Sequence, residues 1–211
     1  TSSLFCSSTS GLRPTVLQAE MKHPDRFVVG HRFNPVYLFP IVEICGGVNT
    51  SAEAKQSAAA FYREVGMKPL ILRKEIDAFI ADRLMEAVWR EGLWLIRDDV
   101  ATTEELDDAI RFGFGLRWAQ MGLFETYRVA GGDAGMRHFI SQFGPTLSWP
   151  WTKLMDVPEL NEELINKIVT QSEEQSGMHS IRELELIRDD NLVAIMQGLK
   201  LHDCGAGALL K

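Results

Sequence analysis

The pattern of apolar and polar residues divides the chain into two parts with different periods. Up to residue 73, short apolar runs alternate with segments that have helical spacing. From residue 74 onward, the apolar positions recur almost entirely at helical spacing. The pattern therefore predicts an α/β domain over residues 1–73, followed by an all-α domain over residues 74–211.

Short apolar runs predict the strands of the first part, and the segments between them predict its helices. The strands are expected at residues 3–8, 26–31, 41–46 and 68–74, and the helices at residues 13–21 and 49–66. Thr50 or Ser51 can cap the second helix, with Glu53 in its first turn. Gly66 is placed to end it.

The second part reads as a series of amphipathic helices. They are expected at residues 77–99, 102–113, 118–132, 133–144, 161–177 and 180–203. The first of them is apolar around much of its circumference, with Trp89 and Trp94 on different faces. Because one domain layer covers only one stripe of such a helix, this part is expected to form a homodimer.

Charge and composition argue against several classes of partner. The 211 residues carry a formal net charge of −7, which disfavours nucleic acid and anionic membrane surfaces. No apolar run is long enough to span a membrane. The three cysteines, which form no CxxC pair, fit a cytoplasmic location, and the five histidines lack metal-ligand spacing, so no metal is expected.

Two ionisable residues stand inside apolar runs. His31 ends the run FVVGH, and Glu43 lies within PIVEI. A histidine alone is most simply a core residue bonded to a backbone carbonyl. A buried carboxylate needs a partner, however, and an imidazole bonded to it would keep its second nitrogen free as a general base. Hydroxyl side chains in CSSTSG add a candidate serine at a neighbouring strand end, where a turn role is the alternative.

These motifs resemble the 3-hydroxyacyl-CoA dehydrogenase family. SSTSGL, GHRFNPVYLFPIVEI and KEIDAFIADRLMEA occur in the family's order and spacing over residues 5–90, with the glutamate twelve residues after the histidine. The resemblance implies a Rossmann-type sheet followed by a helical dimerisation domain. Residues 1–73 would then be the C-terminal part of the dinucleotide-binding domain.

The resemblance also implies roles for individual side chains. Ser10 would bind the substrate hydroxyl, His31 would remove its proton, and Glu43 would orient and charge the imidazole. The family's asparagine falls on Asp82, which cannot donate an amide hydrogen bond. A catalytic role and a solvated or Arg83-paired carboxylate therefore both remain open for Asp82.

NAD is the cofactor that the resemblance implies. No GxGxxG in this sequence follows a strand and opens a helix, because GFGLRW follows a helix and GAGALL lies at the end. The chain is therefore expected to be part of a longer NAD-dependent dehydrogenase and to bind NAD weakly by itself. Ser10 and Asn34 would touch the nicotinamide end, although Asn34 also fits a simple turn before Pro35.

Within the family, VVGHRFNPVYLFPIVEICGG and ATTEELDDAIRFGFGLRWAQMG most resemble the branch that oxidises the 3-hydroxyl of L-carnitine. A trimethylammonium substrate favours an aromatic cage. The candidates for this cage are Phe114, Trp118, Phe124 and Tyr127. Their spacing fits a helix core equally well. Arg117 or Arg32 could bind the substrate carboxylate.

Two other hypotheses remain open at this point. The substrate could be a 3-hydroxyacyl-CoA or L-gulonate, as in other branches of the family, although the acidic charge weighs weakly against the phosphates of CoA. The chain could also be an inactive helical dimerisation or structural module. The missing glycine-rich loop favours that hypothesis, and the presence of Ser10, His31 and Glu43 argues against it.

Overall fold

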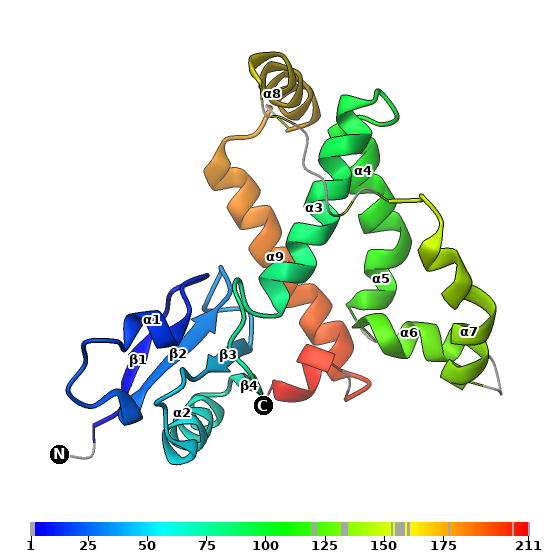
Figure 1. Cartoon of the computed structure of the whole chain (residues 1–211). Coiled ribbons are helices and arrows are strands. Elements are labelled where there is room, and N and C mark those ends of the chain that lie inside the picture. The colour runs from blue at the N-terminus through cyan, green and yellow to red at the C-terminus, as the bar shows by residue number, and fades with distance from the viewer. Residues whose placement is uncertain are drawn as a thin grey trace. The chain divides into compact units, whose positions relative to one another are not determined.

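The computed structural model of the chain describes residues 3–119, 122–131, 135–152, 154, 159, 161–176, 178–203 and 205–210. The chain forms two compact units, one of Thr1–Glu86 with Asn191–His202 and Ala206–Lys211, the other of Ala87–Asp190 with Asp203–Gly205. Figure 1 shows the sheet in the first unit and a series of helices in the second. The α/β and all-α parts expected from the sequence are thus present, and the domain boundary near residue 74 stays a prediction.

A four-stranded mixed sheet forms the centre of the first unit. The strands lie in the order β1 (Phe5–Ser7), β2 (Phe27–Arg32), β3 (Ile41–Cys45) and β4 (Lys68–Ile71). The outer pairs, β1 with β2 and β3 with β4, are parallel, whereas β2 and β3 are antiparallel. The eight-residue connection 33–40 is too short for the crossover that parallel strands need, which explains the antiparallel step.

Three short or medium helices accompany these strands, and the longest is capped as its sequence predicts. They are α1 (Pro14–Leu17), the 3₁₀ turn η1 (Pro24–Arg26) and α2 (Ala52–Glu64). The Ser51 hydroxyl accepts a hydrogen bond of 3.0 Å from the Ala54 amide at the start of α2. Gly66 follows the helix with a φ of +84°, a backbone conformation that glycine adopts at little cost.

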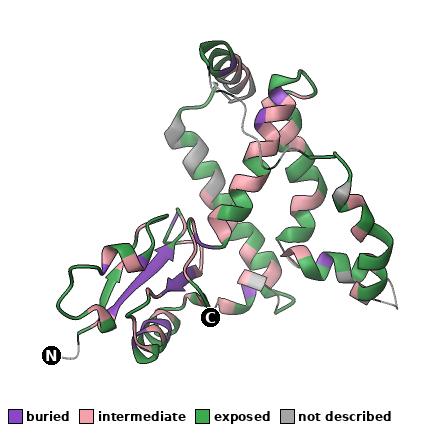
Figure 2. Cartoon of the chain, in the orientation of Figure 1, coloured by how far each residue is buried: buried purple, intermediate pink, exposed green. Residues whose placement is uncertain are grey.

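Both faces of the central strands are buried (Figure 2). Side chains alternate along β2 and β3, so Val28, Val42 and Ile44 pack with Ala54 and Ala58 of α2 on one face. On the other face a second cluster contains Phe27, Val29, Cys45, Leu72 and Phe79. The two polar residues inside these strands, His31 and Glu43, are therefore buried, whereas Arg32 at the end of β2 is exposed.

Helices make up the second unit. It contains α4 (Thr103–Ala109), the π-helical turn η2 (Ile110–Phe114), α5 (Gly115–Trp118), α6 (Gly122–Ala130), α7 (Gly135–Phe143), the 3₁₀ turn η4 (Gly144–Ser148) and α8 (Glu162–Ser176). Two long helices, α3 (Ala81–Arg97) and α9 (Ile181–Lys200), contribute residues to both units, and η5 (Gly205–Leu209) lies near the end. Parts of the predicted helices, at residues 120–121, 132–134 and 177, lie outside the described residues, as does Cys204.

The helix expected at residues 77–99 begins later than its pattern indicates. Helix α3 starts at Ala81, because Ala78 and Phe79 have left-handed φ values of 59° and 53°. The helix expected at residues 102–113 is also modified, since α4 passes into η2 at Ile110. Both differences arise from backbone conformations that cannot be predicted from the spacing of apolar residues.

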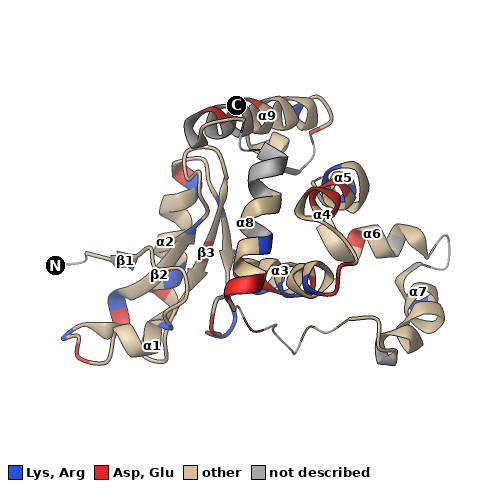
Figure 3. Cartoon of the chain, turned by 90° about the horizontal axis from the view of Figure 1, so that it is seen from above, with Lys and Arg blue, Asp and Glu red and all other residues tan. Residues whose placement is uncertain are grey.

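The charges of the described residues are of mixed sign over both units, with Lys and Arg scattered among Asp and Glu (Figure 3). None of the helices in the described ranges is both long and apolar enough to cross a membrane.

Candidate functional site

Strand register brings His31 and Glu43 together. In the antiparallel pair of β2 and β3, the Cα atom of His31 lies directly opposite that of Glu43. Residues paired in this way point to the same face of the sheet. That face is the one that carries Val29 and Cys45, which are also paired with each other. His31 and Glu43 are twelve residues apart in the sequence, but they are in direct contact across two neighbouring strands.

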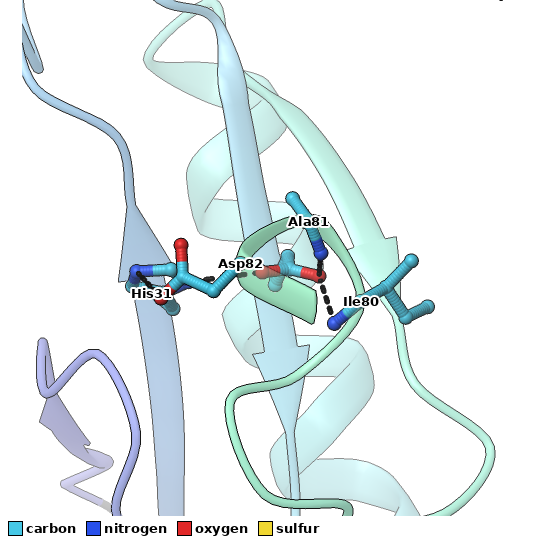
Figure 4. A network of polar contacts seen from close by, with 5 residues as sticks. His31, Ile80, Ala81 and Asp82 are labelled. Carbon is cyan, nitrogen blue, oxygen red and sulfur yellow. Dashed lines mark hydrogen bonds and ion pairs between the residues drawn. The ribbon is translucent and has the colours of Figure 1, made fainter. Parts of the chain in front are cut away.

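Glu43 is fully buried, and both of its carboxylate oxygens have partners (Figure 4). Oε2 lies 2.9 Å from Nδ1 of His31. Oε1 accepts hydrogen bonds from the backbone amides of Ile80, at 2.9 Å, and Ala81, at 3.1 Å. These amides lie at the start of α3, where the helix dipole favours negative charge. Both backbone amides donate, so Oε1 acts as a hydrogen-bond acceptor despite its burial.

The segment before α3 places these amides. Ala78 and Phe79 are consecutive left-handed residues, a conformation that costs energy for side chains other than glycine. Phe79 is fully buried in the apolar cluster beside the site, and its ring lies 5.3 Å from the His31 ring. Phe33 lies on the same imidazole at 4.8 Å. The two aromatic rings and the Glu43 hydrogen bond together fix the orientation of His31.

The bond to Glu43 determines which nitrogen of His31 is available. With Glu43 as a carboxylate, which can only accept, the tautomer that fits this contact carries its proton on Nδ1 and donates a hydrogen bond to Oε2. In the neutral imidazole, Nε2 then has a free lone pair and can accept a proton. This is the arrangement of a general base that is oriented by a buried acid.

Asp82 approaches the same imidazole from the other side. Its Oδ2 lies 3.7 Å from Nε2 of His31, which is an ion-pair distance but longer than a hydrogen bond. The Asp82 side chain is 21% exposed and lies in the first turn of α3. The structure therefore places Asp82 next to His31, while a pairing with Arg83 remains only the alternative from the sequence.

Ser10 and Asn34 follow the ends of β1 and β2. The register of this parallel pair aligns Ser7 with Val29, so the chain leaves both strands at the same edge of the sheet. Both residues are exposed there. Asn34 precedes Pro35 through a cis peptide bond, and the Pro35 carbonyl accepts from the amides of Leu38 and Phe39 in a turn. The turn expected at Asn34 is thus present, and the roles of Ser10 and Asn34 stay predictions.

The four aromatic candidates do not form one cluster in the described part of the chain. Phe114 and Trp118 have ring centroids 4.6 Å apart, whereas Tyr127 stacks on Phe139, also at 4.6 Å. Phe124 is largely exposed. The binding of a trimethylammonium group by these four aromatic side chains stays a prediction.

The two arginine candidates differ in position. Arg32 immediately follows His31 in β2, and strand alternation turns it toward the opposite face of the sheet. It is therefore a poor candidate for binding a substrate carboxylate beside His31. Arg117 lies in α5 and is exposed.

Cys45 lies on the same face as Glu43 but does not have the properties of a nucleophile. Burial raises the pKa of its thiol to about 11, with smaller contributions from the negative charges of Glu75 and Glu43. The thiol is therefore protonated at neutral pH and acts as a small core residue. Within the described ranges, no group of three or more His, Cys, Asp or Glu side chains could hold a metal ion.

Sequence reasoning missed the backbone and aromatic parts of this site. The backbone amides of Ile80 and Ala81 cannot be identified from a pattern of side chains. The acid-rich start of a helix, close to a buried glutamate, could have suggested that these amides bind Glu43. Phe33 and Phe79 both lie in the motifs named above, but the contact of Phe79 with His31 depends on the turn at Ala78.

Comparison with known families covers most of the chain. Residues 1–76 match the model for the 3-hydroxyacyl-CoA dehydrogenase NAD binding domain, and residues 79–170 match that for the 3-hydroxyacyl-CoA dehydrogenase C-terminal domain.

Curated relatives are similar over almost the entire chain. An L-carnitine dehydrogenase of Mesorhizobium japonicum is 64% identical over 210 residues, which cover 97% of this chain and 58% of that protein. An L-carnitine dehydrogenase/betainyl-CoA thioesterase of Agrobacterium fabrum is 60% identical over 99% of this chain and 42% of its own length. An L-carnitine dehydrogenase of Pseudomonas aeruginosa is 57% identical, with coverages of 93% and 61%. The chain spans about half the length of the curated relatives it matches.

The fold is also found among solved structures. The crystal structure of 5-formyl-3-hydroxy-2-methylpyridine 4-carboxylic acid 5-dehydrogenase, described as an NAD⁺-dependent dismutase, superimposes with a TM-score of 0.74. It is 23% identical and the match covers 93% of this chain and 64% of that one, so it supports the fold alone. From the two matching domain models and the relatives that align with nearly all of it, the chain belongs to the 3-hydroxyacyl-CoA dehydrogenase family.

Proposed function

We propose that the protein carrying this chain oxidises the 3-hydroxyl of L-carnitine to 3-dehydrocarnitine with NAD. The observation that carries the proposal is the buried contact of His31 with Glu43, which leaves Nε2 as a general base. The relatives at 57–64% identity, which are named L-carnitine dehydrogenases, support the choice of substrate.

In this reaction His31 receives the proton of the substrate hydroxyl on Nε2. As the O–H bond breaks, C3 of the substrate loses its hydrogen as hydride and its bond to oxygen becomes a carbonyl. Bound NAD supplies the acceptor for this hydride. The imidazolium that forms on His31 is stabilised by Glu43, whose charge is held in turn by the amides of Ile80 and Ala81.

The residues at the edge of the sheet fit the nicotinamide end of such a cofactor. Ser10 and Asn34 are exposed where β1 and β2 end, at the same edge as His31. Ligands of α/β sheets bind at the carboxyl ends of parallel strands, as these two strands provide. We assign Ser10 to the substrate hydroxyl and Asn34 to the nicotinamide.

A substrate comparison with the full-length protein tests the proposal. NADH formation, followed by absorbance, is expected with L-carnitine and to be much slower with 3-hydroxybutyryl-CoA and L-gulonate. His31→Gln should lower kcat by at least about 100-fold, because general-base catalysis contributes 10²–10⁴-fold. His23→Gln, which changes an exposed histidine elsewhere in the first unit, serves as the matched control.

Other outcomes would contradict this function in different ways. Faster turnover of 3-hydroxybutyryl-CoA or L-gulonate would support the proposed oxidation of a hydroxyl but would show that L-carnitine is not the substrate. No NADH formation with any of the three would favour an inactive structural role. Full activity of His31→Gln would remove His31 as the base.

The proposal includes a homodimer. Helix α3 exposes several large apolar side chains, namely Leu84, Met85, Val88 and Trp89. Apolar side chains gathered at this spacing on one helix are typical of a buried contact. A second copy of the chain is the partner that the family resemblance implies.

A further inference from the structure

Asp82 is a carboxylate beside the nitrogen that the proposed reaction uses. Its Oδ2 lies 3.7 Å from Nε2 of His31 (Figure 4). This separation exceeds a hydrogen bond, so Nε2 is not committed to Asp82 and can still accept a proton from a substrate. A hydroxyl bound to Nε2 would necessarily lie within a few ångströms of the Asp82 carboxylate.

The other nearby carboxylate cannot contact a substrate. Glu43 is fully buried, and both of its oxygens are occupied by His31 and by two backbone amides. Asp82 is partly exposed, and its carboxylate lies beyond hydrogen-bond distance of the imidazole. It lies in the first turn of α3.

The proposed substrate carries a positive charge close to its reacting hydroxyl. In L-carnitine the quaternary nitrogen is attached to the carbon next to the one that is oxidised. This group has no N–H and cannot donate a hydrogen bond, so it is attracted by charge and by aromatic faces alone. A 3-hydroxyacyl-CoA and L-gulonate have no cation at this position.

We infer that Asp82 is a specificity-determining residue, whose carboxylate binds the quaternary ammonium group when the neighbouring hydroxyl is bound to His31. This inference rests on the proposed oxidation of L-carnitine. Asp82 thereby selects substrates whose cation is attached to the carbon next to the oxidised one over neutral substrates of the same shape.

A pair of substrates that differ only in charge tests the inference. In 3-hydroxy-5,5-dimethylhexanoate a carbon atom replaces the quaternary nitrogen, so the shape is kept and the charge is lost. In the full-length protein, Asp82→Asn should lower kcat/KM for L-carnitine by roughly 10- to 100-fold, as expected when one of two opposite charges a few ångströms apart is removed near a protein surface. For the neutral analogue, kcat/KM should change by less than about threefold, since no charge pair is lost.

Two further variants separate recognition from structure. Asp82→Glu keeps the charge and should retain most of the preference for L-carnitine over the analogue. Asp77→Asn removes a negative charge from the same segment, where Asp77 is exposed and paired with Arg13 at 3.3 Å, and should leave the preference unchanged. If the analogue is not oxidised, its inhibition constant against L-carnitine takes the place of kcat/KM.

The outcomes are distinct. An equal loss for both substrates in Asp82→Asn would mean that Asp82 acts by positioning His31, and would overturn the inference while leaving the proposed function intact. An unchanged preference would overturn it as well. If the unaltered protein does not oxidise L-carnitine, the proposed function fails and the inference fails with it.

Discussion

Glu43 combines complete burial with a full set of hydrogen-bond donors. Its sequence neighbours Val42 and Ile44 face α2, so the glutamate itself must point to the opposite, equally buried face. The interaction with His31 could be expected from the sequence, because a buried acid needs a partner. The contact with the start of α3 could not be expected, since it depends on backbone amides and on the conformation of Ala78 and Phe79.

Replacing Glu43 with glutamine should inactivate the protein while keeping its fold. The amide oxygen of Gln can still accept from the amides of Ile80 and Ala81, but its NH₂ group would then face Nδ1 of His31. The imidazole would move its proton to Nε2 and could no longer act as a base. In the full-length protein we expect kcat with L-carnitine to fall roughly 10²- to 10⁴-fold, as for comparable tautomer errors.

Glu75→Gln is the matched control for this change. Glu75 also accepts a backbone hydrogen bond, from Thr15 at 2.9 Å, and is partly buried in the same unit. Its substitution should leave kcat within about threefold, because surface or peripheral changes rarely alter the chemical step. Similar kinetics for the two variants would show that the tautomer argument is wrong.

The Cys45 thiol should make the stability of the fold sensitive to alkaline pH. Its pKa is raised from 9.0 to about 11, chiefly by burial. The unfolded chain therefore releases this proton at lower pH than the folded one, and the stability that is present below pH 9 is lost as the pH rises toward 11. Between pH 8 and pH 10 the contribution of Cys45 should fall by roughly 1 kcal/mol, which corresponds to a pKa difference acting over about one pH unit.

Urea unfolding of the unaltered protein and of Cys45→Ala at the two pH values measures this effect. Tyr62, whose pKa burial and a hydrogen bond to Cys6 raise to about 12, contributes equally to both proteins and cancels in the comparison. Equal losses of stability in the two proteins would contradict the assignment to Cys45.

Among the secondary-structure elements, the cap predicted for α2 is present, whereas the interiors of the helices agree less well with their predicted ranges. Ser51 caps α2, and Thr102 forms a reciprocal capping box with Glu105 at the start of α4, because these signals are local. The conversion of α4 into the π-helical turn η2 was not predicted. Gly113 there has φ and ψ of −113° and −122°, a conformation that residue spacing does not encode.

The start of α3 is the element whose conformation matters most for the site. Two consecutive left-handed residues, Ala78 and Phe79, turn the chain so that the following amides point at Glu43. Such a conformation costs roughly 1–2 kcal/mol for each residue other than glycine. The burial of Phe79 and the hydrogen bonds to Glu43 offset this cost.

Ala78→Gly should therefore stabilise the protein. Glycine adopts a φ of 59° without the steric penalty, and its greater freedom in the unfolded chain cancels part of the gain. We expect the free energy of unfolding to rise by about 0.5–1 kcal/mol, as seen in the midpoint of urea unfolding. Ala87→Gly, in the interior of α3, is the control and should lower it by about 1 kcal/mol. A loss of stability in Ala78→Gly would show that the left-handed turn is not strained.

For the whole molecule, the sequence predicted the classes of structure but not which distant segments join. Alternation and helical spacing are local, and they correctly indicated a sheet region followed by helices. The inclusion of Asn191–His202 in the same compact unit as the sheet depends on contacts between residues far apart in the chain. The spacing of apolar residues does not predict such contacts. It also did not predict that β3 runs antiparallel to β2.

The homodimer is the prediction that belongs to this scale. Light scattering of the full-length protein at micromolar concentration should give twice the mass of one chain. Trp89→Glu, which places a charge on a side chain that is 59% exposed in α3, should shift the mass toward that of a monomer. Gln56→Glu, at an exposed position of α2, adds the same single negative charge and serves as the control. A monomeric mass for the unaltered protein would contradict the prediction.

The pairing of His31 with Glu43 across β2 and β3 also determines which changes in chain length the protein can accept. The pair depends on strand register, so the connection 33–40 can gain or lose residues without separating the two side chains. A deletion of one residue inside either strand has the opposite effect. It would turn the base or its acid toward α2. Gly30 or Arg32 would then take the place of His31, or Val42 or Ile44 that of Glu43. Natural versions of this protein are thus expected to keep the lengths of both strands unchanged.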